Sequence, residues 1–168
     1  MIILISGSVG CGKTTIAQKL ALKTGYNLFF LNEIAKKFVI GYDNDVNTYD
    51  FDIDLLVEYV EQEIIPLSKN VILEGHFSHF IDSLKVDVLF VIGRDSKLLK
   101  EEYVKRGYNQ KKISENLQVE NFNLSFFEAI ENGFVDKKNL FYVDNNQNIE
   151  KTVEEILKLI YLNVKKSK

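Results

Sequence analysis

The chain has 168 residues, enough for one domain with a full hydrophobic core and too few for two domains of ordinary size. Hydrophobic residues make up 46% of the chain and charged residues 27%, a composition that excludes intrinsic disorder and indicates a globular protein. The formal net charge of -3 argues against broad, non-specific binding to nucleic acids.

Apolar runs of four to seven residues alternate with amphipathic stretches along the chain. The expected strands are residues 2–5, 27–31, 71–74, 86–92 and 140–143. The expected helices are residues 14–23, 32–38, 52–65, 96–106, 111–132 and 149–164, with residues 41–50 as a loop. The alternation predicts a single α/β domain over residues 1–168, with a parallel five-stranded sheet between two layers of helices.

Four residues are assigned to the ends of these helices from cap preferences. Gly25 is expected to end the first helix, Asn32 to cap the second, Pro66 to stop the third and Ser96 to cap the fourth. In parallel sheets of this kind, ligands bind at the carboxyl ends of the strands. The motifs described below all follow such strand ends.

The chain shows no sign of export or of a membrane anchor. Residues 1–6 are apolar, but they run straight into a glycine-rich loop, lack basic residues and are too short for a signal peptide or a membrane span. Cys11 is the only cysteine, so no internal disulfide can form. We expect a cytoplasmic protein, or a nuclear one in a eukaryote. The basic residues Lys165, Lys166 and Lys168 are interpreted as a solvated tail.

Residues 7–14 match the phosphate-loop pattern G-x-x-x-x-G-K-[ST] at Gly7, Gly12, Lys13 and Thr14. A buried strand precedes the match and an amphipathic helix follows it, as a P-loop requires. The glycines, Gly10 among them, let backbone amides approach phosphates, and the helix directs the positive end of its dipole to the same place. The motif therefore predicts a nucleoside triphosphate site.

Each polar residue of the loop has an expected role. Lys13 reaches the β- and γ-phosphates, the Thr14 hydroxyl is a ligand of Mg²⁺, and Thr15 bonds the α-phosphate. Cys11 has two interpretations: a small loop residue with no role, or a thiol whose pKa is lowered at a helix N-terminus.

The strand at residues 71–73 ends in Glu74, and the histidine His76 comes two residues later. A P-loop enzyme needs an acid at such a strand end to hold magnesium through its water shell, so Glu74 is the second expected metal residue. Its alternative is a solvent-facing acid. Because His76 lies beside this acid, we expect it to orient a phosphate or a water in catalysis. His79 is interpreted as an ordinary histidine of a polar loop, and no zinc site is expected.

Several blocks together are similar to one family. The chain resembles, over nearly its whole length, the archaeal and eukaryotic adenylate kinases of the isoenzyme-six type, also called CINAP. The resemblance rests on residues 7–15, 32–35, 74–79 and 106–109, with Lys112, Glu115 and Asn116.

The resemblance implies a nucleoside monophosphate kinase fold with a short lid and the reaction ATP + AMP = 2 ADP with Mg²⁺, beside a slower ATPase. It also implies assistance to maturation of the small ribosomal subunit, in contact with a ribosomal protein. Neither a membrane nor sequence-specific nucleic-acid binding is expected. The monophosphate-binding segment falls near residues 30–51, the lid near residues 105–115, and the family's catalytic, ATP-binding arginine matches Arg106.

The residues themselves agree with a lid at Arg106, since Gly107 can serve as a hinge and Lys111 and Lys112 follow. A fixed guanidinium stabilises the charge spread over a phosphoryl group in transfer. Three positions depart from the family, which often has arginine there: Gly93, next to Arg94, Glu102 and Lys36. These departures bear on AMP binding and transfer more than on ATP binding.

Other functions stay open on the same motifs. An ATP-dependent assembly factor for the small ribosomal subunit would keep the ATP site, with incidental kinase activity. A small-molecule kinase of the shikimate type is less favoured, because residues 16–92 hold no arginine for a substrate carboxylate. A GTPase is less favoured still, because the guanine-reading pattern Asn-Lys-x-Asp is absent.

Overall fold

The computed structural model describes residues 1–166, with side chains to residue 162. The basic tail of Lys165, Lys166 and Lys168 lies outside the described side chains, so its solvated state remains a prediction. No helix in the described part of the chain combines the length and the apolarity that a membrane crossing needs.

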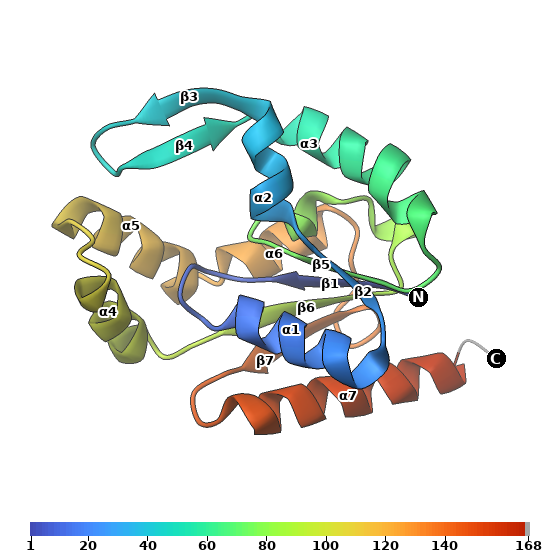
Figure 1. Ribbon diagram of the computed structural model, residues 1–168. Helices are drawn as coiled ribbons and strands as arrows, with labels where there is room; N and C mark the ends of the chain where they lie inside the picture. Colours follow the sequence, from blue (N-terminus) through green and yellow to red (C-terminus); the bar gives the residue numbers. More distant parts are fainter. Residues whose placement is uncertain (167–168) are drawn as a thin grey trace.

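A five-stranded parallel sheet forms the centre of the molecule (Figure 1), which confirms the predicted α/β fold. Its spatial order is β2–β5–β1–β6–β7. The strands are β1 (Ile2–Ser6), β2 (Asn27–Phe30), β5 (Val71–Glu74), β6 (Val88–Gly93) and β7 (Leu140–Asp144). In the register of β1 and β5, Ile5 lies opposite Glu74, so the P-loop and the predicted acid leave the sheet side by side.

Alternate residues of each strand face opposite layers, because a strand has a side-chain period of two. Ile3 and Ile5 of β1 pack with buried residues of α1 (Lys13–Thr24), α4 (Ser96–Lys105) and α7 (Ile149–Lys166). Leu4 packs instead with those of α3 (Ile53–Tyr59) and α6 (Leu124–Glu131). Apolar side chains on both faces explain why the strands are continuous apolar runs in the sequence.

The third predicted helix is present but is not regular throughout. It begins at α3, capped by the side chain of Asp52, which accepts a hydrogen bond of 3.0 Å from the Leu55 N–H. It continues as a π-helical segment over Val60–Ile64 and ends in a 3₁₀ turn over Ile65–Leu67, where Pro66 lies. The extended Ser68 follows, so the predicted stop near Pro66 is confirmed.

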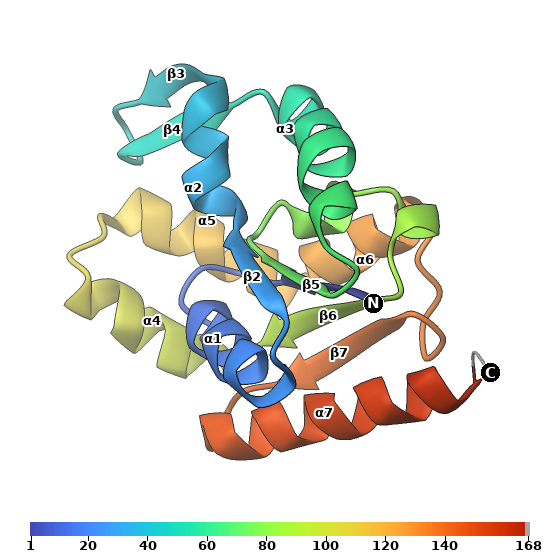
Figure 2. The same cartoon turned by 45° about the vertical axis from the view of Figure 1, so that its right-hand side comes forward.

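The prediction of a loop at residues 41–50 is wrong. These residues belong to an antiparallel hairpin of β3 (Val39–Asp43) and β4 (Thr48–Phe51), which lies beyond the carboxyl edge of the sheet (Figures 1 and 2). The hairpin was missed because its two strands are short and largely exposed, so neither forms a buried apolar run. Of the Asp and Asn residues that suggested a loop, Asn44, Asp45 and Asn47 form its turn, where Asp43 Oδ1 accepts the Asp45 N–H at 2.7 Å.

Two predicted caps are wrong: the cap of α2 (Leu31–Ala35) is Phe30, two positions before Asn32, and the cap of α4 is one position before Ser96. Helix α2 starts before Asn32, and a 3₁₀ turn over Lys36–Phe38 follows it. The cap of α4 is Asp95, whose carboxylate accepts the N–H groups of Lys97 and Leu98, so Ser96 is the first helical residue. An ionised aspartate makes charge-assisted hydrogen bonds to these N–H groups, which a serine hydroxyl does not.

The long helix predicted over residues 111–132 is two helices. Helix α5 (Gln110–Asn121) begins after Asn109, whose side chain accepts the Lys112 N–H at 2.9 Å. It is separated from α6 by Asn123, which has a left-handed backbone with φ of 49°. Asparagine tolerates this conformation better than most residues, and a single such residue ends a helix.

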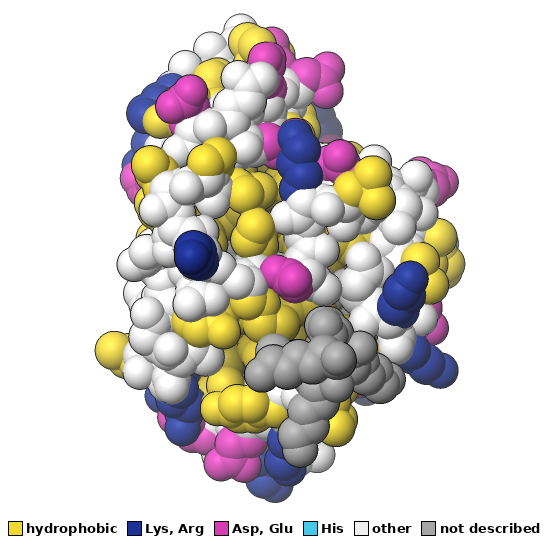
Figure 3. All heavy atoms as spheres, turned by 90° about the vertical axis from the view of Figure 1, so that its right-hand side faces the viewer, with side chains coloured by type: hydrophobic (Ala, Val, Ile, Leu, Met, Phe, Trp, Pro, Cys, Tyr) yellow, Lys and Arg dark blue, Asp and Glu magenta, His cyan; other side chains and the backbone are white. Residues whose placement is uncertain are grey.

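The amino ends of the strands face away from every predicted motif. Figure 3 shows this face of the molecule, with apolar side chains in the middle and charged side chains scattered around them. The P-loop follows β1 and Glu74 ends β5, so the site lies at the opposite, carboxyl edge.

Candidate active site

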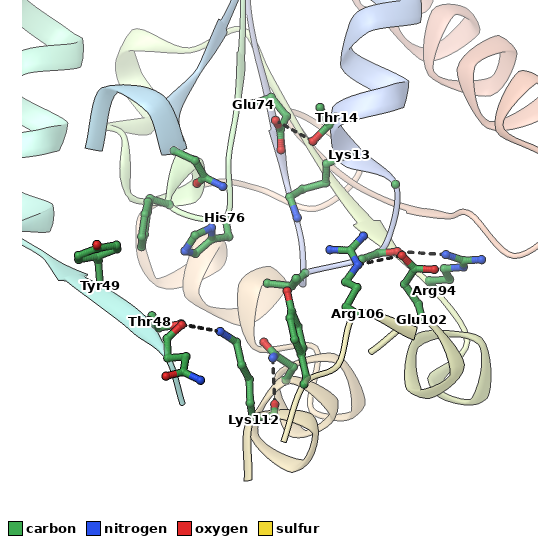
Figure 4. A pocket seen from close by; sticks show the side chains of 18 of the residues that line it. Lys13, Thr14, Thr48, Tyr49, Glu74, His76, Arg94, Glu102, Arg106 and Lys112 are labelled. Carbon is green, nitrogen blue, oxygen red and sulfur yellow. Dashed lines mark hydrogen bonds and ion pairs between the residues drawn. The ribbon is translucent and has the colours of Figure 1, made fainter. Parts of the chain in front are cut away.

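A cleft of about 970 Å³ opens at the carboxyl edge of the sheet. The P-loop, the segment after β5, the β3–β4 hairpin and the region where α4 meets α5 line it (Figure 4). The structure brings together in this cleft the predicted residues Gly10, Gly12, Lys13, Thr14, Thr15, Glu74, His76 and Arg106.

The phosphate loop has the backbone that its glycines predict. Gly7, Gly10 and Gly12 all have positive φ, and a Cβ at Gly12 would lie 2.5 Å from Asn145 Nδ2. No side chain caps the N-terminus of α1, which starts at Lys13. The first amides of this helix are therefore free of side-chain partners and can bind an anion.

Lys13 is folded back onto the loop. Its Nζ donates to the carbonyl oxygens of Gly7 at 2.9 Å and Ser8 at 2.7 Å, and the residue is only 8% exposed. A buried ammonium needs such partners. The same group lines the cleft, so phosphate oxygens can replace the two carbonyls.

Cys11 is fully buried, and the hypothesis of a low-pKa thiol is wrong. Burial raises the pKa of this thiol above its ordinary value, and the charge of Lys13 only partly opposes the increase. The backbone carbonyl of Cys11 accepts a hydrogen bond of 2.8 Å from Asn145 Nδ2, so Cys11 is a structural part of the loop.

Thr14 and Glu74 meet at the mouth of the loop. The Thr14 hydroxyl donates to Glu74 Oε2 at 3.2 Å, and Glu74 is only 4% exposed, which excludes the solvent-facing alternative. Burial raises the pKa of Glu74, while the charge of Lys13 and the Thr14 hydroxyl lower it. A carboxylate and a hydroxyl are the oxygen donors that Mg²⁺ prefers, so this pair fits the predicted metal.

The two histidines lie in different surroundings. His76 lines the cleft, and its ring lies 3.7 Å from that of Phe77, centroid to centroid. Burial, and then the charges of Lys13 and His79, lower the pKa of His76 to about 4. At neutral pH this imidazole is uncharged and can act through hydrogen bonds rather than as a cation.

His79, which we interpreted as an ordinary histidine of a polar loop, does not line the cleft and is buried. It is 2% exposed, and its Nδ1 lies 2.7 Å from Ser6 Oγ. Its Nε2 lies 2.9 Å from the Glu128 carboxylate, yet burial and the charge of Lys13 lower its pKa to about 4. His79 thus joins the end of β1 to α6.

Both arginines of the chain reach the cleft. Arg106 follows α4, and its Nε donates to Glu102 Oε1 at 2.8 Å. Glu102, which stands where the family often has arginine, therefore forms an ion pair with Arg106 within the site. Arg94 donates from Nη1 to the Gly10 carbonyl at 3.1 Å. From the sequence, Arg94 was noted as the neighbour of Gly93 and as one of only two arginines, which limits the candidates for arginine-dependent chemistry, but it was given no role of its own.

The hairpin and α5 close one side of the cleft. Lys112 Nζ donates to Thr48 Oγ1 at 2.8 Å and to the Asn47 carbonyl at 3.1 Å. Lys111 pairs with Asp45 at 2.8 Å, but among these two lysines only Lys112 lines the cleft. The sequence did not reveal these contacts, because they join segments more than 60 residues apart.

A glycine-rich loop, its lysine, a hydroxyl and a strand-end acid in one cleft of a parallel sheet define a P-loop protein of the kinase fold. The family model described as "AAA domain" matches residues 3–123. A protein named "Putative adenylate kinase" from Thermococcus kodakarensis is 37% identical over 167 residues, 99% of this chain and 89% of that protein. The protein of the same name from Pyrococcus abyssi is 36% identical over 99% of this chain and 87% of its own length. The chain therefore belongs to the family of P-loop proteins that the AAA-domain model describes, together with these two archaeal relatives.

Solved structures show the same fold at low sequence identity. A gluconokinase from Sinorhizobium meliloti has a TM-score of 0.59 at 15% identity, covering 97% of this chain and 93% of that one. A sugar kinase from a Janibacter species has a TM-score of 0.56 at 14% identity, covering 95% of this chain and 93% of that one. These likenesses concern the fold alone.

Proposed function

We propose that this chain is a nucleoside monophosphate kinase that transfers the γ-phosphoryl group of ATP to AMP and yields two ADP. One observation carries the proposal: the P-loop and a second set of polar and aromatic side chains face each other across a single cleft. Its volume of about 970 Å³ lies at the upper end of the range for small-molecule sites, which suits two nucleotides better than one. The archaeal relatives' name supports the same reaction.

ATP is assigned to the P-loop end of the cleft. Its phosphates take the place of the Gly7 and Ser8 carbonyls at Lys13 Nζ and accept hydrogen bonds from the first amides of α1. Thr14 and Glu74 would hold Mg²⁺, the latter through water. When bound, the metal neutralises charge on the β- and γ-phosphates.

AMP is assigned to the opposite end, between residues 30–51 and His76. Asn32, Tyr49 and Phe51 line the cleft there, and Phe77 packs edge-on against Phe51 at 5.6 Å between ring centroids. Aromatic rings and an amide suit a nucleobase. The uncharged His76 orients the AMP phosphate or a water by hydrogen bonding.

Residues 105–115 are assigned as the lid. Gly107 has a φ of 71°, which glycine adopts without strain, so this position can serve as a hinge. On closure the Arg106 guanidinium leaves Glu102 for the phosphoryl group in transfer, whose charge it stabilises. The Glu102 ion pair opposes this step, which makes a modest transfer rate the expected result.

A coupled assay with ATP and each monophosphate tests the proposal. We expect ADP formation that depends on AMP, and strong thermal stabilisation by the analogue that joins two adenosines through five phosphates. Binding of that analogue at both ends at once stabilises the folded state by an amount that grows with the logarithm of its affinity. Absence of AMP-dependent ADP formation, with ATP still bound, would refute the kinase assignment and leave an ATPase.

The narrower assignment to the isoenzyme-six type rests on the motif resemblance alone. This assignment adds an ATPase activity and binding to a ribosomal protein of the small subunit. Neither the fold nor the names of the relatives support these two properties, which follow only from the motif resemblance. ATP hydrolysis measured with and without that ribosomal protein tests this part. The shikimate-type alternative predicts phosphorylation of a carboxylate-bearing small molecule in the same assay, with no response to AMP.

A further inference from the structure

We propose that Glu120 is a positioning residue of the phosphate site, whose carboxylate holds the P-loop and Arg94 in the arrangement that binds ATP. This inference rests on the proposed function, because it concerns the same ATP site. Glu120 is not among the residues that line the cleft, so it acts through its neighbours.

One carboxylate joins four parts of the fold. Glu120, near the C-terminus of α5, accepts a hydrogen bond at Oε2 from the hydroxyl of Ser8 in the P-loop. Its Oε1 accepts the backbone N–H of Arg94 at 2.7 Å and the Tyr142 hydroxyl at 3.3 Å. The loop, the segment after β6, and β7 are thereby tied to α5.

Arg94 extends this arrangement to the front of the loop. Its backbone N–H is held by Glu120, while its guanidinium donates to the Gly10 carbonyl and lines the cleft. The Tyr142 hydroxyl fills the space beside Gly93, where an added Cβ would lie 1.8 Å from it. A side chain at position 93 would require Tyr142 to move away from Glu120, and in this chain Arg94 supplies the guanidinium at this strand end.

The charge of Glu120 by itself opposes anion binding. A carboxylate behind a polyphosphate site repels the ligand, and the low dielectric of the interior strengthens the repulsion. Its field reaches the loop: burial raises the pKa of the Cys11 thiol, and the charge of Glu120 adds to that increase. A carboxylate at this position therefore strengthens ATP binding only if the affinity gained by holding the P-loop and Arg94 in place exceeds the affinity lost by charge repulsion.

The two effects predict opposite results for Glu120→Gln. Removal of the charge alone would tighten ATP binding. Loss of positioning would weaken it, because an amide oxygen that accepts the Arg94 N–H leaves only the NH₂ group to donate to the Ser8 hydroxyl, so that neutral hydrogen bonds replace the charge-assisted ones of the carboxylate. The direction of the change in affinity therefore decides between them.

The experiment compares Glu120→Gln with Glu131→Gln, an exposed acid on the neighbouring helix α6 that undergoes the same change of charge. Calorimetric titration with MgATP gives the Kd, and steady-state assays give KM and kcat. We expect Glu120→Gln to raise the Kd and the KM for ATP by about tenfold, the scale of one lost charge-assisted hydrogen bond, with a smaller change in kcat. Glu131→Gln is expected to stay within about twofold of the wild type, as exposed substitutions do.

A second variant, Ser8→Ala, removes only the contact with the loop. If Glu120 acts through Ser8, the double variant weakens ATP binding by less than the product of the two single effects. Ser8→Ala also replaces Glu120→Gln as the test if the latter fails to fold, and it is then expected to weaken ATP binding by itself.

The possible failures are distinguishable. A wild-type chain that retains no MgATP would overturn the proposed function and this inference with it. A wild-type chain that binds MgATP, together with Glu120→Gln binding as tightly as Glu131→Gln or more tightly, would overturn the positioning role alone. Full additivity of the Ser8→Ala and Glu120→Gln effects would do the same.

Discussion

Buried histidines make the stability of this protein depend on pH in a defined window. The pKa of His79 is lowered from 6.5 to about 4, so the folded chain takes up this proton only near pH 4, whereas the unfolded chain takes it up near 6.5. Between these values the unfolded state binds more protons. The free energy of unfolding is therefore highest above pH 6.5 and falls as the pH decreases through this window.

The size of the effect follows from the pKa difference. The interval between 6.5 and about 4 corresponds to roughly 3 kcal/mol for one histidine, at about 1.4 kcal/mol for each pH unit. His79 is 2% exposed, so solvent does little to reduce this figure. His76 titrates in the same window, and Glu74, whose pKa is raised, works in the opposite direction near the acid end.

The variant His79→Gln separates the contribution of His79 from those of its neighbours. A glutamine amide can accept from Ser6 and donate to Glu128, but it cannot titrate. Urea unfolding, followed by circular dichroism because the chain has no tryptophan, gives the free energy of unfolding at a series of pH values. We expect the wild type to lose up to roughly 3 kcal/mol more than the variant between pH 7 and pH 4. If the free energy of unfolding changed with pH in the same way for the wild type and His79→Gln, the fold would not be holding His79 neutral.

Four further predictions concern the cleft. Arg106→Ala is expected to lower the transfer rate by roughly 10²–10³-fold in the coupled assay, and a loss below about threefold would remove Arg106 from the mechanism. Lys112→Met is expected to raise the KM for AMP, because Lys112 lines the cleft and binds Asn47 and Thr48 of the hairpin in the segment assigned to AMP. Lys111→Met, which breaks an exposed ion pair outside the cleft, is expected to change this KM by at most about twofold, and equal effects of the two variants would contradict a contribution of Lys112 to AMP binding. Glu74→Gln is expected to raise the Mg²⁺ concentration needed for half-maximal rate, and an unchanged requirement would leave the metal to the P-loop and water. Cys11 is expected to react with iodoacetamide only on unfolding, because it is buried and its pKa is raised; rapid labelling of the folded chain, followed by mass spectrometry, would disprove this.

Local patterns in the sequence determined the sheet and the phosphate loop. The strands are buried on both faces, so their apolar runs are visible without knowledge of their partners. The loop depends on glycines with positive φ, on Lys13 and on Thr14, all within one short segment between a strand and a helix. Glu74 and His76 could be placed because they follow directly from a strand end.

Only the tertiary structure revealed the contacts between segments that are distant in the chain. The hairpin at Val39–Phe51 depends on cross-strand pairs and on contacts with α5, which no local period encodes. Ser8 and Glu120 are 112 residues apart, and His79 is buried because Ser6 and Glu128 come from two other elements. A side chain's burial and partners depend on which surfaces the fold brings together, and that information resides in the packing of the whole chain rather than in any segment.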